Sequence, residues 1–278
     1  MSVQNTPAKV KLPAFSGLNF EESWTTKLQA GWSFHRIDLI TNLKSAKSIS
    51  KIKIDIGGAD VLSITGERLR QLNALYGDHT EQGRFVLDLS NFRYRTIKGI
   101  YQTMLATTLT QDVTLTVEFG KRDTSAGDPE KPVMRATSYI TKTDALGAVF
   151  MPFKKELSQM TAGAGDHVYD YPNGAANVFL QRLIFDENEV KISRILVKRG
   201  GNTIHTYERE DLDFDLQELA GLKLQDGICV LDFTLFGFGS DGALPTQGLS
   251  FEFMVDGKGS IKTYVEGFEQ KKLIRPAA

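Results

Sequence analysis

The sequence predicts an all-β protein made of two tandem jelly-roll β-sandwich or barrel domains with short connecting helices. Two observations carry this prediction. The chain contains a long internal repeat, and most of its regular segments alternate apolar and polar residues with the period of two that half-buried strands show. The composition is that of ordinary globular domains, since 41% of the 278 residues are hydrophobic and 24% are charged.

The repeat is clearest where residues 48–58, SISKIKIDIGG, match residues 191–201, KISRILVKRGG, at an offset of 143. Farther along, residues 84–89 match residues 228–233 at an offset of 144, so the second copy holds one extra residue within 212–216. A period of this length exceeds the roughly 20–50 residues of solenoid repeats. It is the size of a whole domain, and the sequence therefore predicts a duplicated β domain.

Strands and short helices alternate along the first half. The strand predicted over 49–56 is followed by Gly57-Gly58, which predicts a hairpin. A helix is predicted over 67–75, where leucines recur at helical spacing after Thr65 as N-cap. The other expected elements are strands over 34–40, 61–64, 85–92 and 113–119, a strand at the domain edge over 133–140, a helix over 97–105, and a loop or linker over 120–132.

The second half repeats this order after a long loop with several Gly and Asp residues, expected over 158–177. Gly200-Gly201 predicts its hairpin, and Gly221 ends a helix expected over 211–220. The expected strands are 178–185, 192–198, 203–207, 228–238, 249–255 and 261–266. The predicted organisation is an N-terminal arm over 1–17, a first jelly roll with linker over 18–145, a second jelly roll over 146–268, and a C-terminal tail over 269–278.

Charge and cysteine content exclude several classes of protein. The net charge of −1 gives no general attraction to nucleic acid. Cys229 is the single cysteine, which excludes an intrachain disulfide and a thiolate zinc site, and we expect it to be a small buried strand residue.

The N-terminus lacks the apolar stretch of a signal peptide, and no apolar run approaches the roughly 18 residues of a membrane helix. Synthesis in a cytoplasm, in soluble form until assembly, is expected.

Catalytic motifs are missing from the sequence. The four histidines, at positions 35, 79, 167 and 205, lie far apart, and no His-x-His pair occurs as a metal-binding cupin jelly roll needs. The sequence contains no nucleophile-elbow, zinc-protease, P-loop or dinucleotide-binding motif. We therefore expect a protein that is not an enzyme and that has no cofactor.

The two predicted helices of the repeat carry opposite charges. The second-half helix holds Asp211, Asp213 and Asp215, whereas the matching helix of the first half holds Arg68 and Arg70. The three aspartates do not complete an EF-hand loop, because leucine stands at both positions where that loop needs Gly and Glu. A solvated face, another kind of cation site and a subunit interface are the interpretations left open. In the third, complementary helices face each other around a ring, so these five residues are the candidate interface.

The remaining basic residues form short pairs, for which a solvated surface is expected. Weak attraction to an anionic lipid surface is a further expectation for the arm, with Lys9 and Lys11, and for the tail, with Lys271, Lys272 and Arg275. Trp24 and Trp32 flank the first strand and are expected to be core residues.

In the order and pattern of its elements the chain resembles the double jelly-roll major capsid proteins of tailless, membrane-containing icosahedral bacteriophages, above all the compact corticovirus type. The resemblance covers most of residues 30–268 and rests on order and length more than on identity. The segments that carry it are Ile37-Asp38-Leu39, 49–58, 67–75, 85–89, 97–105, 113–119, 150–157, 192–201 and 230–236.

This resemblance implies a structural role in the virion. Three subunits would form one pseudo-hexagonal capsomer, with upright barrels above an internal lipid membrane and a smooth outer end, because the loops are short. The implied partners are further copies of the chain, a penton or vertex protein, and the internal membrane or its proteins, without specific nucleic-acid binding. Some relatives bind divalent ions, but no ligand set in this sequence can be matched to such a site.

Two other functions remain open from the sequence. A carbohydrate-binding or glycan-processing protein with two β-sandwich domains would need clustered aromatic residues or a pair of carboxylates, and distant strands can bring such groups together. A structural protein of a phage tail or baseplate would share the lack of catalytic motifs. It would not need two equivalent upright barrels.

Overall fold

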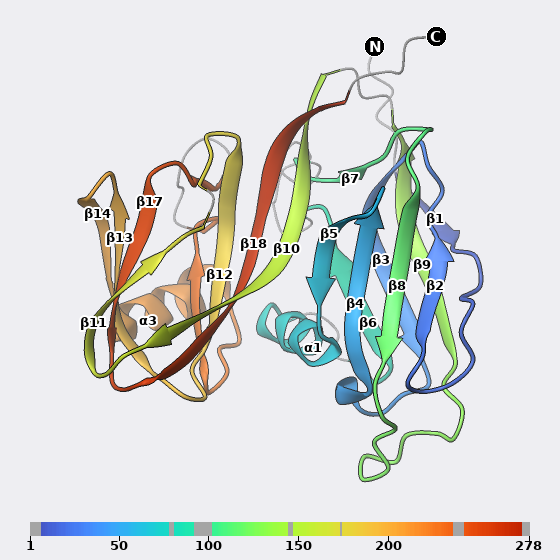
Figure 1. Cartoon of the computed structure of the whole chain (residues 1–278), viewed down its shortest axis with the longest axis horizontal. Helices are drawn as coiled ribbons and strands as arrows, with labels where there is room; N and C mark the ends of the chain where they lie inside the picture. Colours follow the sequence, from blue (N-terminus) through green and yellow to red (C-terminus); the bar gives the residue numbers. More distant parts are fainter. Residues whose placement is uncertain are drawn as a thin grey trace. The chain divides into compact units, whose positions relative to one another are not determined.

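The computed structural model describes residues 7–77, 81–91, 102–143, 147–172, 174–235 and 242–273. They form two compact units (Figure 1). The first unit consists of Met1–Ala74, Asp78–Phe153 and Gln270–Ala278. The second consists of Leu75–Gly77 and Lys154–Glu269.

The first unit has two antiparallel layers. One has the strand order β1-β9-β3-β6, with β7 beside β3, and the other runs β2-β8-β4-β5, with β10 as the next neighbour of β5. The strands are β1 (Ala8–Lys11), β2 (Ser23–Lys27), β3 (Trp32–Thr41), β4 (Ile49–Ile56), β5 (Ala59–Ile64), β6 (Arg84–Asp88), β7 (Leu105–Ala106), β8 (Val113–Phe119), β9 (Met134–Lys142) and β10 (Gly147–Thr161). A short 3-10 helix, η1 (Ala46–Ser48), precedes β4, and α1 (Gly66–Leu75) follows β5.

The second unit has the same two kinds of layer. The strand order is β15-β12-β18-β10 in one, with β16 beside β12, and β11-β17-β13-β14 in the other. The strands are β11 (Gly165–Asp170), β12 (Val178–Asp186), β13 (Ile192–Arg199), β14 (Asn202–Glu208), β15 (Ile228–Asp232), β16 (Leu244–Pro245), β17 (Leu249–Val255) and β18 (Gly259–Leu273). The helix α3 (Arg209–Ala220) follows β14.

The strand pairings of the two units correspond one to one. β3 pairs with β6, β7 and β9, and β12 pairs with β15, β16 and β18. β4 lies between β5 and β8, as β13 lies between β14 and β17. Even the register shifts recur, since the bulge between Phe34 and Arg36 of β3 matches that between Leu180 and Arg182 of β12. The predicted duplication of an all-β domain is confirmed.

The hairpins that open each repeat depend on paired glycines. The φ angles are 61° and 89° at Gly57 and Gly58, and 56° and 85° at Gly200 and Gly201. A two-residue hairpin turn of this hand needs positive φ at both central positions, which side chains with a Cβ resist. The helix α3 ends in the same way, because Gly221 adopts a left-handed conformation with φ of 63°.

One position of the repeat shows how the two copies diverged. Gly66 begins α1, and a Cβ atom there would lie 2.5 Å from the carbonyl oxygen of Ala46 and 2.8 Å from the Cβ atom of Ile49. The matching residue at the start of α3 is Arg209, which has room for a long side chain. The difference arises because the first unit places η1 against the start of its helix, and the second unit has no such turn there among its described residues.

A long loop completes this end of the first unit. The connection from β8 to β9 comprises residues 120–133, whereas residues 256–258 alone join β17 to β18. The loop buries Asp128, which accepts hydrogen bonds from Ser48 Oγ and from the backbone N–H groups of Lys44 and Ser45. Burial alone would raise the pKa of Asp128, but these hydrogen bonds outweigh it and lower the pKa below its usual value.

Buried charges join four strands of the second unit. The carboxylate of Glu266 on β18 accepts from Lys154 of β10 and, at 2.8 Å, from Arg182 of β12. Arg182 also donates to Asp232 of β15 at 2.7 Å. Burial alone would raise the pKa of Glu266, but Lys154 and Arg182 hold it at about 2.

The same positions carry different chemistry in the first unit. By strand register, Arg36 lies opposite both Asp88 and Tyr139, and Tyr139 lies opposite Lys9. Tyr139 therefore takes the place of the buried glutamate. The Lys9 ammonium lies 5.5 Å from the centre of its ring, a cation–π contact in place of an ion pair.

Several sequence-based expectations were wrong. The loop expected over 158–177 is largely strand, because β10 runs to Thr161 and β11 covers Gly165–Asp170. β11 is an edge strand that exposes Asp166 and Val168, so the buried Tyr169 is its main inward signal. The strand at 134–142 is not at an edge, since β1 pairs along its outer side.

Some element bounds also differ. The strands expected to reach residues 92 and 238 end at Asp88 and Asp232. The helix expected over 97–105 lies mostly outside the described residues, and its last residue, Leu105, begins the strand β7 instead. The expected arm contains β1, and the expected tail begins within β18, which reaches Leu273.

We predict that Gly66→Ala lowers the free energy of unfolding by about 1–3 kcal/mol, because the new methyl group meets backbone atoms that cannot move aside cheaply. Urea titration of the purified subunit measures this loss. Gly163→Ala is the matched control, since a Cβ atom there meets nothing within 4 Å. Equal effects of the two substitutions would contradict the steric argument.

Glu266 should also make stability depend on acid. Because its pKa is lowered on folding, its contribution is fully present above the usual value near 4.5 and is lost as the pH falls toward about 2. Glu266→Gln should cost roughly 3–5 kcal/mol at pH 7, since two cations lose their partner. It should also flatten the dependence of stability on pH between about 4.5 and 2. Asp112→Asn, which removes an exposed partner of Lys27, should change neither the stability nor its pH dependence measurably.

Candidate functional site

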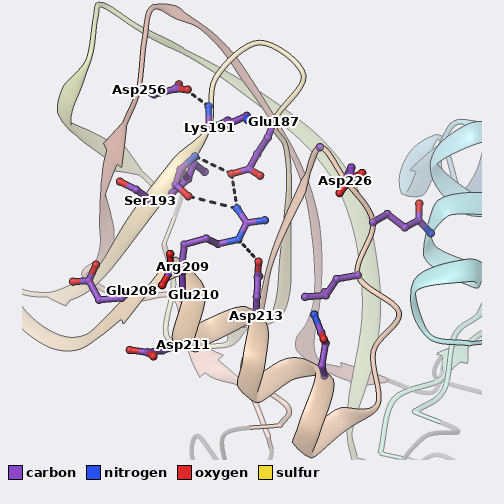
Figure 2. A pocket seen from close by; sticks show the side chains of 15 residues that line it. Glu187, Lys191, Ser193, Glu208, Arg209, Glu210, Asp211, Asp213, Asp226 and Asp256 are labelled. Atoms are coloured by element: carbon purple, nitrogen blue, oxygen red, sulfur yellow. Dashed lines mark hydrogen bonds and ion pairs between the residues drawn. The ribbon is translucent and has the colours of Figure 1, made fainter.

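A pocket of about 1080 Å³ opens beside the first turn of α3 (Figure 2). Residues from the β12–β13 connection, the start of α3 and the turns before β15 and β18 line it. The lining includes two cations, Lys191 and Arg209, and seven carboxylates: Glu187, Glu208, Glu210, Asp211, Asp213, Asp226 and Asp256. The pocket is therefore strongly acidic.

Arg209 is the centre of the pocket wall. Its guanidinium donates to Glu187 Oε1 at 2.6 Å and to Asp213 Oδ2 at 2.7 Å (Figure 2). It also donates to the carbonyl oxygen of Ile228 at 2.8 Å. Glu187, which is nearly buried, also accepts from the backbone N–H of Ile192 at 2.8 Å. These bonds tie the start of α3 to the strands β13 and β15, and they pair two of the seven carboxylates with the one positive charge of Arg209.

The pocket offers charge but no catalytic arrangement. Among the described lining residues there is no histidine or cysteine, so no Ser–His or Cys–His pair can form. In the part of the chain that the structure describes, no group of three or more His, Cys, Asp or Glu side chains could hold a metal ion. Electrostatic attraction of a cationic group is the chemistry that this lining supports.

The acidic residues predicted for a subunit interface lie on α3. Asp211 is exposed and lines the pocket, and Asp213 also lines it but is bound to Arg209. Asp215 is half-buried outside the lining, where its charge contributes to a raised pKa of Tyr207, behind the larger effect of burial. The structure thus brings two of the three aspartates together in one pocket.

The basic residues predicted for the interface lie on α1 in the first unit. Arg68 is only 8% exposed, and the guanidinium carbon of Arg70 lies 5.3 Å from the centre of the Phe85 ring. An interface role for these two residues and for the three aspartates stays a prediction.

Sequence reasoning missed the main wall of the pocket, Glu187 and Arg209. These residues are 22 positions apart, and nothing in their local pattern marks them as partners. The repeat did hold a signal, because Arg209 stands where the first copy has Gly66. A glycine replaced by arginine at matching helix starts indicates that space opened at that end of the second unit.

The remaining residues singled out in the sequence have structural roles. Cys229 is fully buried in β15, and burial raises the pKa of its thiol. Trp24 is buried against Phe119 with ring centres 4.6 Å apart, whereas Trp32 is half-buried. No helix among the described residues is long and apolar enough to cross a membrane.

Two family models match the chain. The N-terminal domain of viral coat protein P2 matches residues 9–141, and the C-terminal domain matches residues 151–271. Together they account for most of the sequence and follow the two copies of the repeat. No curated protein sequence matches the chain.

Solved capsid structures share the fold at low sequence identity. The major capsid protein P2 of bacteriophage PM2 is 12% identical, with 96% of this chain and 98% of that chain covered and a TM-score of 0.81. The Sulfolobus turreted icosahedral virus structure is 11% identical, with 95% of this chain and 91% of that chain covered and a TM-score of 0.67. The PBCV-1 virus capsid is 10% identical, with 99% of each chain covered and a TM-score of 0.63. The fold is that of the double jelly-roll capsid proteins. The chain belongs to the viral coat protein P2 family and is a major capsid protein, a structural component of the virion rather than an enzyme.

Proposed function

We propose that three copies of this chain form one pseudo-hexameric capsomer of an icosahedral shell. The observation that carries the proposal is the one-to-one correspondence of strand pairings between the two units. Three chains contribute six similar jelly rolls, so a trimer can occupy a sixfold lattice position without needing six identical chains.

Side chains on α3 support a subunit contact at this helix. Phe214 and Leu219 are each 66% exposed, and the exposed Asp211 lies on the same helix. In the first copy, Leu75 matches Leu219 and is only 1% exposed. Large apolar side chains left in water beside charges are typical of surfaces that become buried on association.

The capsomer is proposed to stand above an internal lipid membrane in the virion, after synthesis in the host cytoplasm, and to meet a penton or vertex protein at the fivefold positions. Exposed Lys9 and Lys11 on β1 supply positive charge for an anionic lipid surface.

The proposed jelly rolls extend over 18–145 and 146–268, between an arm over 1–17 and a tail over 269–278.

The mass of the purified protein tests the trimer. Size-exclusion chromatography with light scattering should give a species of three times the subunit mass of 30.9 kDa. Electron microscopy of this species should show pseudo-hexagonal particles. A monomer at high concentration, with or without divalent ions, would overturn the proposal.

Asp211→Lys tests whether α3 contributes to assembly. Reversal of this exposed charge should weaken the trimer at least tenfold at low salt, and the effect should shrink at high salt, because screening removes like-charge repulsion. Thermal unfolding of the isolated subunit should change little, since Asp211 is exposed. Glu156→Lys, at an exposed site on β10, is the matched control. An unchanged trimer in both variants would exclude Asp211 from the interface.

A further inference from the structure

The outer edge of β14 is a feature of the second unit that the subunit alone does not explain. β14 ends the strand order β11-β17-β13-β14, so among the described strands none is hydrogen-bonded to its far side. The strand is seven residues long, reads NTIHTYE, and contains neither proline nor lysine, two common safeguards of edge strands. Its β-branched and aromatic residues favour strand pairing.

The matching edge of the first unit is covered. β5 takes the place of β14 in the repeat, and β10 is its next neighbour. Leu62 and Ile64 of β5 are each only 1% exposed. At the matching positions of β14, His205 is exposed and Tyr207 is half-buried, with their rings stacked 6.1 Å apart. At this edge the first unit has a neighbouring strand, β10, whereas the second unit has none among the described strands.

The repeat identifies the segment that corresponds to the covering strand. β10 neighbours β18 as β1 pairs with β9, so β10 and β1 are equivalent strands. Lys154 contacts Glu266, and Lys9 lies over Tyr139, which occupies the equivalent position of β9. The sequences agree with this match, since PFK at 152–154 corresponds to PAK at 7–9. The part of β10 before Phe153 therefore corresponds to residues 2–7.

We propose that residues 2–7 of a second copy of the chain add to the outer edge of β14 as an extra strand. The segment reads SVQNTP, carries no charge that would have to be desolvated, and directly precedes β1. Strand addition of this kind gains main-chain hydrogen bonds along an exposed sheet edge. It would give β14 a neighbouring strand on the side where β5 has β10.

The choice of a second copy rests on the proposed trimer. Within one chain, the strand that covers β5 leads into the following jelly roll. The strand that covers β14 should likewise lead into the following jelly roll, which in a pseudo-hexamer is the first unit of the next copy. The arm would then link neighbouring subunits around the ring.

Hydrogen exchange of the assembled protein tests the added strand. Amides of residues 202–208 should exchange at least tenfold more slowly in the trimer than in the dissociated subunit. The amides of β5 serve as an internal control, since their neighbour β10 belongs to the same chain. A trimer in which β14 exchanges as fast as in the subunit would overturn the inference and leave the proposed function intact.

Two matched pairs of variants test the donor segment. Neighbouring N–H groups of a strand point to opposite edges, so the backbone N–H of either residue 4 or residue 5 should donate to β14. One of the variants Gln4→Pro and Asn5→Pro should therefore remove a hydrogen bond to β14. Gln4→Ala and Asn5→Ala keep the backbone N–H group. At least one proline variant should lose the protection of 202–208, and both alanine variants should retain it. Protection that survives both prolines and deletion of residues 1–7 would mean that another segment covers β14, which overturns the proposal.

Cross-linking shows which copy supplies the segment. Asn5→Cys is combined in turn with Ile204→Cys and Thr206→Cys, while the fully buried Cys229 remains in place. Equal amounts of nitrogen-14 and nitrogen-15 protein are dissociated, reassembled and treated with a short bismaleimide. Light–heavy linked peptides joining the arm to β14 are the expected result. Links only within light or within heavy chains, or no links in an intact trimer, would overturn the proposal.

Discussion

The second unit depends on one buried carboxylate. Glu266 lies between Lys154 and Arg182, and Arg182 reaches on to Asp232, so a single network spans β10, β18, β12 and β15. Four ionised groups in an apolar sheet are tolerable only when each charge has its partner in place, and the network therefore fixes which strands are neighbours and in what register.

The two copies of the domain kept their backbone and changed their side chains. Strand pairings, bulges and hairpin glycines recur, but Tyr139 stands where the second copy has Glu266, and Gly66 where it has Arg209. The largest divergence is at one end of the unit, where the first copy has a long loop anchored by Asp128 and the second has an acidic pocket. Backbone hydrogen bonding constrains the strands, and the connections were left to diverge.

The sequence was most informative where strands lie inside a sheet. The expected bounds 49–56, 113–119 and 249–255 agree with β4, β8 and β17, because both neighbours are paired and one face is buried, which enforces alternation. The short edge strands β1 and β11 escaped detection because no side chain of β1 is buried and, among the described side chains of β11, only Tyr169 is buried, so alternation is weakly enforced. The pocket could not be predicted either, because it arises from a loop-length difference and from a pair between Glu187 and Arg209 that are distant in sequence.

The long strands β10 and β18 also determine how the chain can come apart. Each begins in one unit and ends in the other, so the second half of the sequence contributes Gln270–Ala278 to the first unit, and the connecting strand belongs to both. Neither half of the gene duplication is therefore a complete folding domain. The subunit should melt in one cooperative transition, with neither barrel persisting after the other has unfolded.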